Sequence, residues 1–295
     1  MKAKNVKLIL CALTTCVLFS CTDKDDVAII ETPTVPSLIV KFKFDPDQER
    51  LNNLGQPSTV PAGNAAQTPD FNKISSHFLE FSPNANTPLG EGTRLYRGQE
   101  TSIGGEPAFD FSKAIICAQG ETFLSIPLKD IKPGSYEWAR CSLSYQNYDI
   151  SVLSSGIDYI GTLASFVGTR TYITTHKVGN YPFVINGNRN QGYWAFGLKG
   201  VDYSTSGQAP AGATTVPNPI AATSPLPPNS CVVTGKFPTN LVITGKETKD
   251  IVVTLSLSIN KSFEWTEVNA DGKYEPSAGE NVVDMGLRGL VPSFK

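Results

Sequence analysis

Histidine is scarce in this chain, which has two histidines among 295 residues. So few imidazoles leave little room for histidine-based catalysis or for a histidine-rich metal site. The charged residues nearly balance, with 25 Lys and Arg against 27 Asp and Glu, so the chain lacks the basic excess of nucleic-acid-binding proteins. The motifs G-x-S-x-G, H-E-x-x-H and C-x-x-C and the Walker-type loop are also absent. We therefore expect no nucleic-acid partner and none of the enzyme classes that carry those motifs.

Long hydrophobic runs are absent except at the N-terminus, where Leu8 to Phe19 follow Lys2, Lys4 and Lys7. This run is shorter than the roughly 20 apolar residues that span a bilayer, and its basic flank is typical of a secretory signal peptide. The residues Leu18-Phe19-Ser20-Cys21 resemble the lipobox of bacterial lipoproteins. That resemblance implies that residues 1–20 are cleaved and that Cys21 carries acyl chains such as palmitate. The alternative is ordinary secretion after cleavage.

The residues after Cys21 are polar and include Lys24-Asp25-Asp26, which is similar to the surface-export signal of Bacteroidota lipoproteins. The resemblance implies a lipid anchor in the outer membrane at the cell surface, with residues 21–36 as a flexible tether. A plain solvated tether is the alternative. Removal of the signal would discard three lysines and no acids, which changes the net charge from −2 to −5.

Cysteines are few once the N-terminal segment is considered. Of the six, Cys11 and Cys16 lie in the signal and Cys21 is the predicted lipidation site. The remaining three are Cys117, Cys141 and Cys231, an odd number that allows at most one disulfide and leaves its pairing open. Cys117 and Cys141 have apolar neighbours, which favours buried, unreactive thiols.

Alternating polar and apolar residues predict an all-β fold, an antiparallel β-sandwich with at most one or two short helices. Val40, Phe42 and Phe44 alternate with lysines, and residues 251–259 place four aliphatic side chains on one face. The other expected strands are 74–81, 122–128, 135–145, 171–178, 181–185, 192–198 and 241–244. Short helices are expected only at 157–167 and at 48–54.

Residues 37–295 are expected to form one β-sandwich domain. The segment 204–230 contains six prolines without apolar periodicity, which predicts a surface loop. The alternative is a linker that splits the chain into units 37–203 and 231–295.

The strongest local motif for a metal lies near the C-terminus. Glu267, Asn269 and Asp271 alternate before Gly272, a pattern that resembles the calcium loops of EF-hands and of many extracellular β modules. The resemblance implies calcium bound by the side chains of Glu267, Asn269 and Asp271 and by the Lys273 carbonyl group, with Glu280 as a further acid. The alternative is an Asp-Gly turn without a metal.

A second candidate site is aromatic. Tyr193 and Trp194 lie near Gln191 and several asparagines, and exposed aromatic rings beside amides are typical of glycan sites. Core packing of the same residues is the alternative. His77 and His176 fall in expected strands, where we expect them at the surface or at a sheet edge.

Two further segments carry a resemblance. Val40-Lys41-Phe42-Lys43-Phe44 and Asp130-Ile131-Lys132-Pro133-Gly134-Ser135-Tyr136 are similar to the β-domain of methanobactin-partner copper proteins. This similarity implies a β-sandwich fold. Since the chain lacks a histidine cluster, it does not imply copper.

Together these features predict a surface-anchored binding or adhesion module without enzymatic activity. Its ligand would be an extracellular glycan or protein, and calcium would stiffen the fold. The alternative is an enzyme acting on extracellular polysaccharide through a pair of carboxylates that come together only in the fold.

Overall fold

Strands make up 58% of the structure and helical residues 4%, which confirms the predicted all-β fold. The structure is a computed structural model that describes residues 35–51, 56–209 and 232–295. Val35–Lys295 cluster as one compact unit. Cys21, Cys231, the signal and residues 21–34 of the predicted tether lie outside the described residues.

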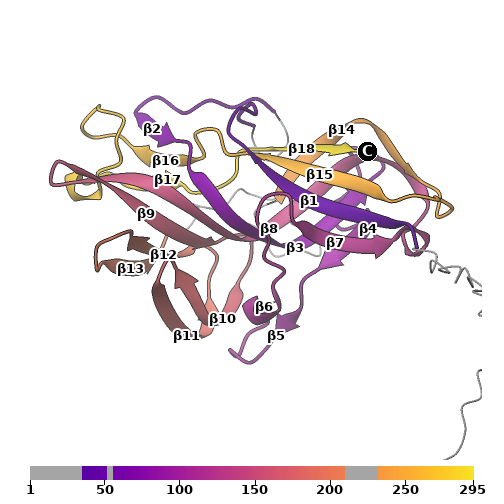
Figure 1. Cartoon of the computed structure of the whole chain (residues 1–295), viewed down its shortest axis with the longest axis horizontal. Coiled ribbons are helices and arrows are strands. Elements are labelled where there is room, and N and C mark those ends of the chain that lie inside the picture. Colours follow the sequence, from indigo (N-terminus) through magenta and orange to yellow (C-terminus); the bar gives the residue numbers. More distant parts are fainter. Residues whose placement is uncertain (1–34, 52–55, 210–231) are drawn as a thin grey trace, which may run out of the picture. The chain divides into compact units, whose positions relative to one another are not determined.

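The largest sheet, here called the central sheet, has seven strands in the order β13-β12-β9-β8-β3-β4, with β14 also paired to β8 (Figure 1). Its strands are β3 (Asp70–Ser82), β4 (Thr93–Arg97), β8 (Gly134–Ser154), β9 (Ile157–Phe166), β12 (Tyr193–Leu198), β13 (Ser204–Gln208) and β14 (Val232–Ile243). The 21-residue strand β8 pairs with β14 along its first half and with β9 along its second half. All these pairings are antiparallel.

The first covering layer is a four-stranded sheet in the order β18-β15-β1-β7. It contains β1 (Ser37–Asp45), β7 (Thr122–Pro127), β15 (Ile251–Ser258) and β18 (Leu290–Phe294). Here β1 and β15 are parallel, although more than 200 residues separate them in the chain. Alternate residues of both strands, among them Val40, Phe42 and Leu255, enter the main hydrophobic core together with Cys141 and Leu143 of β8.

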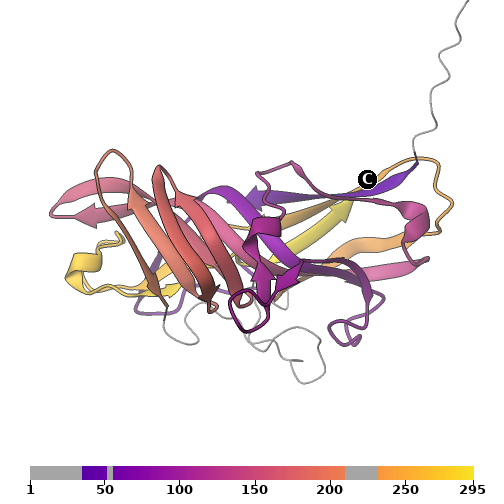
Figure 2. The ribbon, with the colours of Figure 1, turned by 90° about the horizontal axis from the view of Figure 1, so that it is seen from below.

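A second layer, in the order β11-β10-β6-β5, packs on the other face of the central sheet. Its strands are β5 (Glu100–Thr101), β6 (Ala108–Asp110), β10 (Thr171–Val178) and β11 (Tyr181–Arg189), and β6 pairs with β10 in parallel. Ile173 and Val178 of β10 meet Tyr145, Phe166 and Ala195 in a separate small core. Viewed from below, Figure 2 shows this second layer as a group of strands beside the first.

Smaller elements complete the described fold. A three-stranded sheet joins β2 (Asn64–Gln67), β16 (Phe263–Thr266) and β17 (Val282–Asp284), and its Trp265 is fully buried in the main core. Three 3₁₀ helices of three residues each, η1 (Phe111–Lys113), η2 (Leu128–Asp130) and η3 (Pro276–Ala278), lie in connections.

One local prediction was wrong, and a second is tested only in part. The segment expected as a helix at 157–167 forms β9, because tertiary pairing overrides its helical spacing and residues 161–166 are buried on both faces. Of the segment 48–54, the described residues 48–51 contain no helix, and residues 52–54 lie outside the described part. The proline-rich segment begins as a strand, since its first five residues form β13, and residues 210–230 lie outside the described part.

Candidate functional site

The two predicted ligand-binding aromatics, Tyr193 and Trp194, lie on opposite faces of β12. Tyr193 is 4% exposed and belongs to the small core beneath β10. Its hydroxyl lies 3.5 Å from Nε2 of His176, and the Arg189 guanidinium lies 5.4 Å from the centre of its ring. The structure therefore assigns Tyr193 to packing and does not join it to Trp194 in one surface.

Trp194 and Phe196, which we call the aromatic surface, lie half-buried on the other face of β12, where both also pack against the main core. Trp194 pairs with Gly207 of β13, and a Cβ atom at Gly207 would come within 2.7 Å of the indole ring. A Cβ atom at Gly161 of β9 would likewise meet the Phe196 ring at 2.1 Å. The two glycines thus give each ring the space to lie across a neighbouring strand. The sequence alone does not place these glycines beside Trp194 and Phe196, because their juxtaposition depends on strand register.

Polar residues continue the Trp194 row toward the interior of the sheet. Trp194 pairs with Ser165 of β9, which pairs with Gln146 of β8. Both polar side chains are fully buried. A ligand on the outside would therefore contact the indole ring and not these two side chains.

The predicted calcium residues form a turn stabilised by backbone hydrogen bonds. Oε1 of Glu267 accepts from the backbone N–H groups of Asp271 and Gly272, each at 2.8 Å. Glu280 is buried and accepts from the backbone N–H groups of Val268 and Glu275. The Asp-Gly turn of the alternative hypothesis is therefore present, with Gly272 at φ +71°.

Side chains of the same loop are engaged with protein groups. Nδ2 of Asn269 donates to Glu275, and the ammonium group of Lys273 binds Asp158 of β9 at 2.9 Å. Within the described ranges, no group of three or more His, Cys, Asp or Glu residues is placed to hold a metal ion. Calcium binding stays a prediction.

Both histidines are buried, contrary to the expectation of a surface or edge position. His77 of β3 and His176 of β10 are 7% and 6% exposed. Burial lowers the pKa of each imidazole to about 4, so both are neutral near pH 7. A charged histidine is thus unavailable for chemistry at neutral pH.

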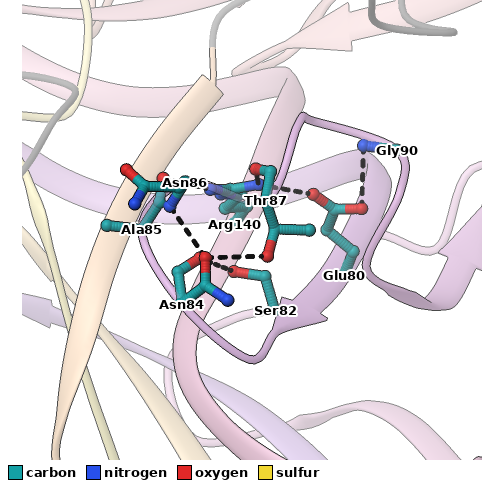
Figure 3. Close-up of polar contacts among 8 residues, drawn as sticks. All are labelled: Glu80, Ser82, Asn84, Ala85, Asn86, Thr87, Gly90 and Arg140. Atoms are coloured by element: carbon teal, nitrogen blue, oxygen red, sulfur yellow. Dashed lines mark hydrogen bonds and ion pairs between the residues drawn. The ribbon is translucent and has the colours of Figure 1, made fainter.

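The buried acids of the described residues each have a compensating partner. Glu80 of β3 lies 3.3 Å from Arg140 of β8, and its other oxygen accepts from the Gly90 N–H group (Figure 3). Arg140 also donates to the carbonyl groups of Thr87 and Ala85, so this pair holds the 84–90 loop. Burial raises the pKa of Glu80.

A second buried pair joins Glu264 of β16 to Arg50 at 2.5 Å, and Asn64 donates to the other oxygen of Glu264. The third buried acid is Glu280, described above. Each buried carboxylate is paired with an arginine or with backbone N–H groups. These interactions give the three acids a structural role in holding loops.

Cys117 and Cys141 are free and buried. Burial raises the pKa of Cys117 to about 11 and that of Cys141 to about 12, which keeps both thiols protonated and unreactive at neutral pH. Among the described residues, no helix has the length and apolar character needed to cross a membrane.

No family model, curated protein or solved structure matches this chain. The resemblances to surface lipoproteins and to the methanobactin-partner β-domain stay predictions. Function is therefore inferred from the chain's own residues, and the aromatic surface is the feature that best fits a ligand.

Proposed function

We propose that this protein is a lipid-anchored surface protein that binds an extracellular carbohydrate without changing it chemically. The observation that carries this proposal is the aromatic surface, where Trp194 and Phe196 each lie across a glycine. Sugar rings have apolar C–H faces that stack on flat aromatic side chains. A strand-borne pair of rings is a rigid platform for such stacking because its backbone is fixed by ladders on both sides.

The position of this surface suits display away from an anchor. The described chain enters beside η2 and β15, where Leu128 donates to the Pro36 carbonyl group and Ser37 donates to Asp250. Gly134, at the start of β8, follows η2 by a few residues. Trp194 pairs with Ser165, which pairs with Gln146 of β8, and Gln146 lies twelve residues after Gly134. At a rise of about 3.3 Å per residue, the length of β8 between Gly134 and Gln146 is about 40 Å.

Affinity gel electrophoresis against a panel of soluble polysaccharides tests the binding. We expect retarded migration of the wild type in at least one gel and a loss of at least tenfold in affinity for Trp194→Ala. Tyr193→Phe is the matched control, because Tyr193 is the adjacent residue on the buried face. Equal migration of the wild type and Trp194→Ala in every gel would contradict the proposal.

The anchor has a separate test. Metabolic labelling with palmitate and fractionation of cells should place label and protein in the membrane fraction, and Cys21→Ser should lose both. Protease treatment of intact cells then reports surface exposure. A Cys21→Ser protein that stays in the membrane fraction would contradict lipid anchoring without affecting the carbohydrate result.

Calcium is tested by titration calorimetry of the full chain. If the 267–280 turn binds the ion, the wild type releases or absorbs heat on titration, and Asp271→Ala abolishes that heat. Flat traces from both proteins would leave the turn with the purely structural role seen in its backbone hydrogen bonds.

A further inference from the structure

The aromatic surface continues beyond Phe196 on the same face of the central sheet. Leu198 pairs with Gly161 of β9, and the residues of a strand alternate between its two faces, so Tyr159 and Ile157 share the face of Gly161. Tyr159 is half-buried, and Ile157 is 55% exposed. This face therefore runs from β12 onto the part of β9 that extends past the end of β12.

A second tyrosine extends the same face on the β13 side. The Leu198 N–H group donates to the carbonyl group of Tyr203, which places Tyr203 opposite Leu198 just before β13 begins. Tyr203 is 49% exposed. Its own N–H group lies 2.9 Å from the Val201 carbonyl oxygen and 3.3 Å from the Tyr181 hydroxyl oxygen, so hydrogen bonds fix the turn that carries this ring.

Four aromatic side chains make up this surface, here called the extended aromatic face: Trp194, Phe196, Tyr159 and Tyr203. Along the strands, Trp194 to Leu198 spans four residues and Gly161 to Tyr159 spans two more, which makes six. At a rise of about 3.3 Å per residue, the face is about 20 Å long. Since one sugar ring is about as large as one aromatic ring, a face of this length is suited to several sugars in a row.

The side chains at the far end of this face are the most exposed. Ile157 and Tyr203 are about half exposed, and Val201 in the adjacent turn is 42% exposed. A pocket for a small molecule encloses most of the surface of its ligand. Side chains as exposed as these contact a ligand from one side only, which leaves a polymer chain free to continue past them.

The extended aromatic face carries no charge of its own. Thr205 and Gly207, which lie opposite Phe196 and Trp194 on β13, are also uncharged. Lys199 lies in the turn after β12, but its ammonium group binds Asp149 on the opposite face of the sheet. Asp202 is exposed in the same turn and would repel an anionic chain. These residues therefore favour an uncharged ligand.

We propose that the extended aromatic face binds the interior of a linear, uncharged glycan chain, an inference that rests on the carbohydrate binding proposed above. Successive sugar rings stack along the face from Trp194 toward Tyr203 and Tyr159. Because each stacked ring adds a small increment of binding, affinity rises with the number of sugars until the face is filled. Recognition of a terminal sugar alone would show no such rise.

Affinity gels and titration calorimetry on the full chain test this inference. The gels contain xylan, galactomannan or mixed-linkage β-glucan as uncharged probes and alginate as an anionic probe. We expect retarded migration in at least one uncharged gel and none in alginate. In calorimetry, the hexasaccharide of the retarding polysaccharide should bind about tenfold more tightly than its disaccharide.

Substitutions at Tyr203 test the far end of the face. Tyr203→Ala removes an exposed ring and should weaken hexasaccharide binding about fivefold. Tyr203→Phe keeps the ring and should bind like the wild type. Val184→Ala removes a side chain that is 69% exposed on β11 and is the control without effect. If Tyr203→Ala does not fold, as circular dichroism would show, the length series with the wild type decides.

The outcomes separate this inference from the proposed carbohydrate binding. Equal affinity of the wild type for the disaccharide and the hexasaccharide would overturn the extended site, as would retardation by alginate alone or unchanged hexasaccharide affinity in a folded Tyr203→Ala. In each of these cases, a loss of binding in Trp194→Ala would leave carbohydrate binding itself intact. Unretarded migration of the wild type in every gel would overturn both.

Discussion

His176 lies among three aromatic rings at the interface between β10 and the central sheet. Its imidazole stacks on Phe183 with ring centres 5.2 Å apart and meets Phe166 and Tyr193 edge to face. His77 is equally buried, near Phe109. These surroundings stabilise the neutral imidazole, which explains why the pKa of each histidine falls to about 4.

The stability of the protein should therefore fall on mild acidification. In the unfolded chain both histidines take up protons near pH 6.5, whereas the folded chain binds them only near pH 4. Stability from these residues is complete above pH 6.5 and declines as the pH falls toward 4. For His77 the decline is on the order of 3 kcal/mol. Urea unfolding at several pH values measures this decline, with His77→Gln for comparison. An equal change of unfolding free energy with pH in both proteins would contradict the prediction.

The Glu80–Arg140 pair gives a second prediction at this scale. Removal of one partner leaves a buried charge uncompensated, so Glu80→Leu and Arg140→Met should each lose about 3–5 kcal/mol of unfolding free energy. The double variant Glu80→Leu/Arg140→Met buries no charge and should lose less than the sum of the two. A double-mutant cycle by urea unfolding measures this coupling. Strictly additive losses would show that the two side chains act independently.

At the scale of elements, the β9–β10 connection depends on one glycine. Gly168 has φ +83°, and an added Cβ atom would collide with the Leu143 carbonyl oxygen. Gly168→Ala should therefore destabilise the fold by more than about 2 kcal/mol. Gly120 has φ +77° but open space around it, so Gly120→Ala should cost only the backbone strain of about 1–2 kcal/mol. Thermal unfolding compares the two variants, and equal losses would refute the steric argument.

Strand positions could be predicted well where one face of the strand is buried and the other is exposed to solvent. Residues 171–178 were predicted with the bounds of β10, and residues 251–259 differ from β15 by one residue. The segment 157–167 was mistaken for a helix because Leu163 and Ala164, on opposite faces of β9, are both buried. A strand covered on both faces loses the alternation on which sequence prediction depends.

The candidate site was predicted only in part for the same kind of reason. Trp194 was identified from its residue type, but neighbouring strand residues point to opposite faces, and only the pairing partners show which face is covered. Tyr193 is covered by the β10 layer, whereas Trp194 is half-buried and packs against the main core. Gly207 lies 13 residues from Trp194 and Gly161 lies 35 residues from Phe196, so the role of these glycines depends on register.

At the scale of the whole molecule, the C-terminal strands complete sheets begun by N-terminal strands. β15 lies between β1 and β18, and β14 pairs with β8. A fragment of residues 35–209 would expose the core face of β1, including Val40 and Phe42. We expect this fragment to show no cooperative unfolding by circular dichroism. A cooperative transition would support two units within the chain.

Long-range pairing of this kind could not be predicted from the sequence. The clear alternation in residues 38–44 and 251–259 predicts two strands, but nothing local indicates that they are neighbours or that they run parallel. The order of strands follows from which hydrophobic faces fit together in the core, and this information is spread over the whole chain.

The placement of β1 also determines how the protein bears mechanical load. A pull on the residues before Val35 enters β1 at Ser37 and acts along the axis of the strand. β1 is flanked by eight residue pairs with β15 on one side and five with β7 on the other. The hydrogen bonds on both sides are then loaded together in shear and do not open one after another like a zipper. This end of the chain is therefore built to resist extraction by force.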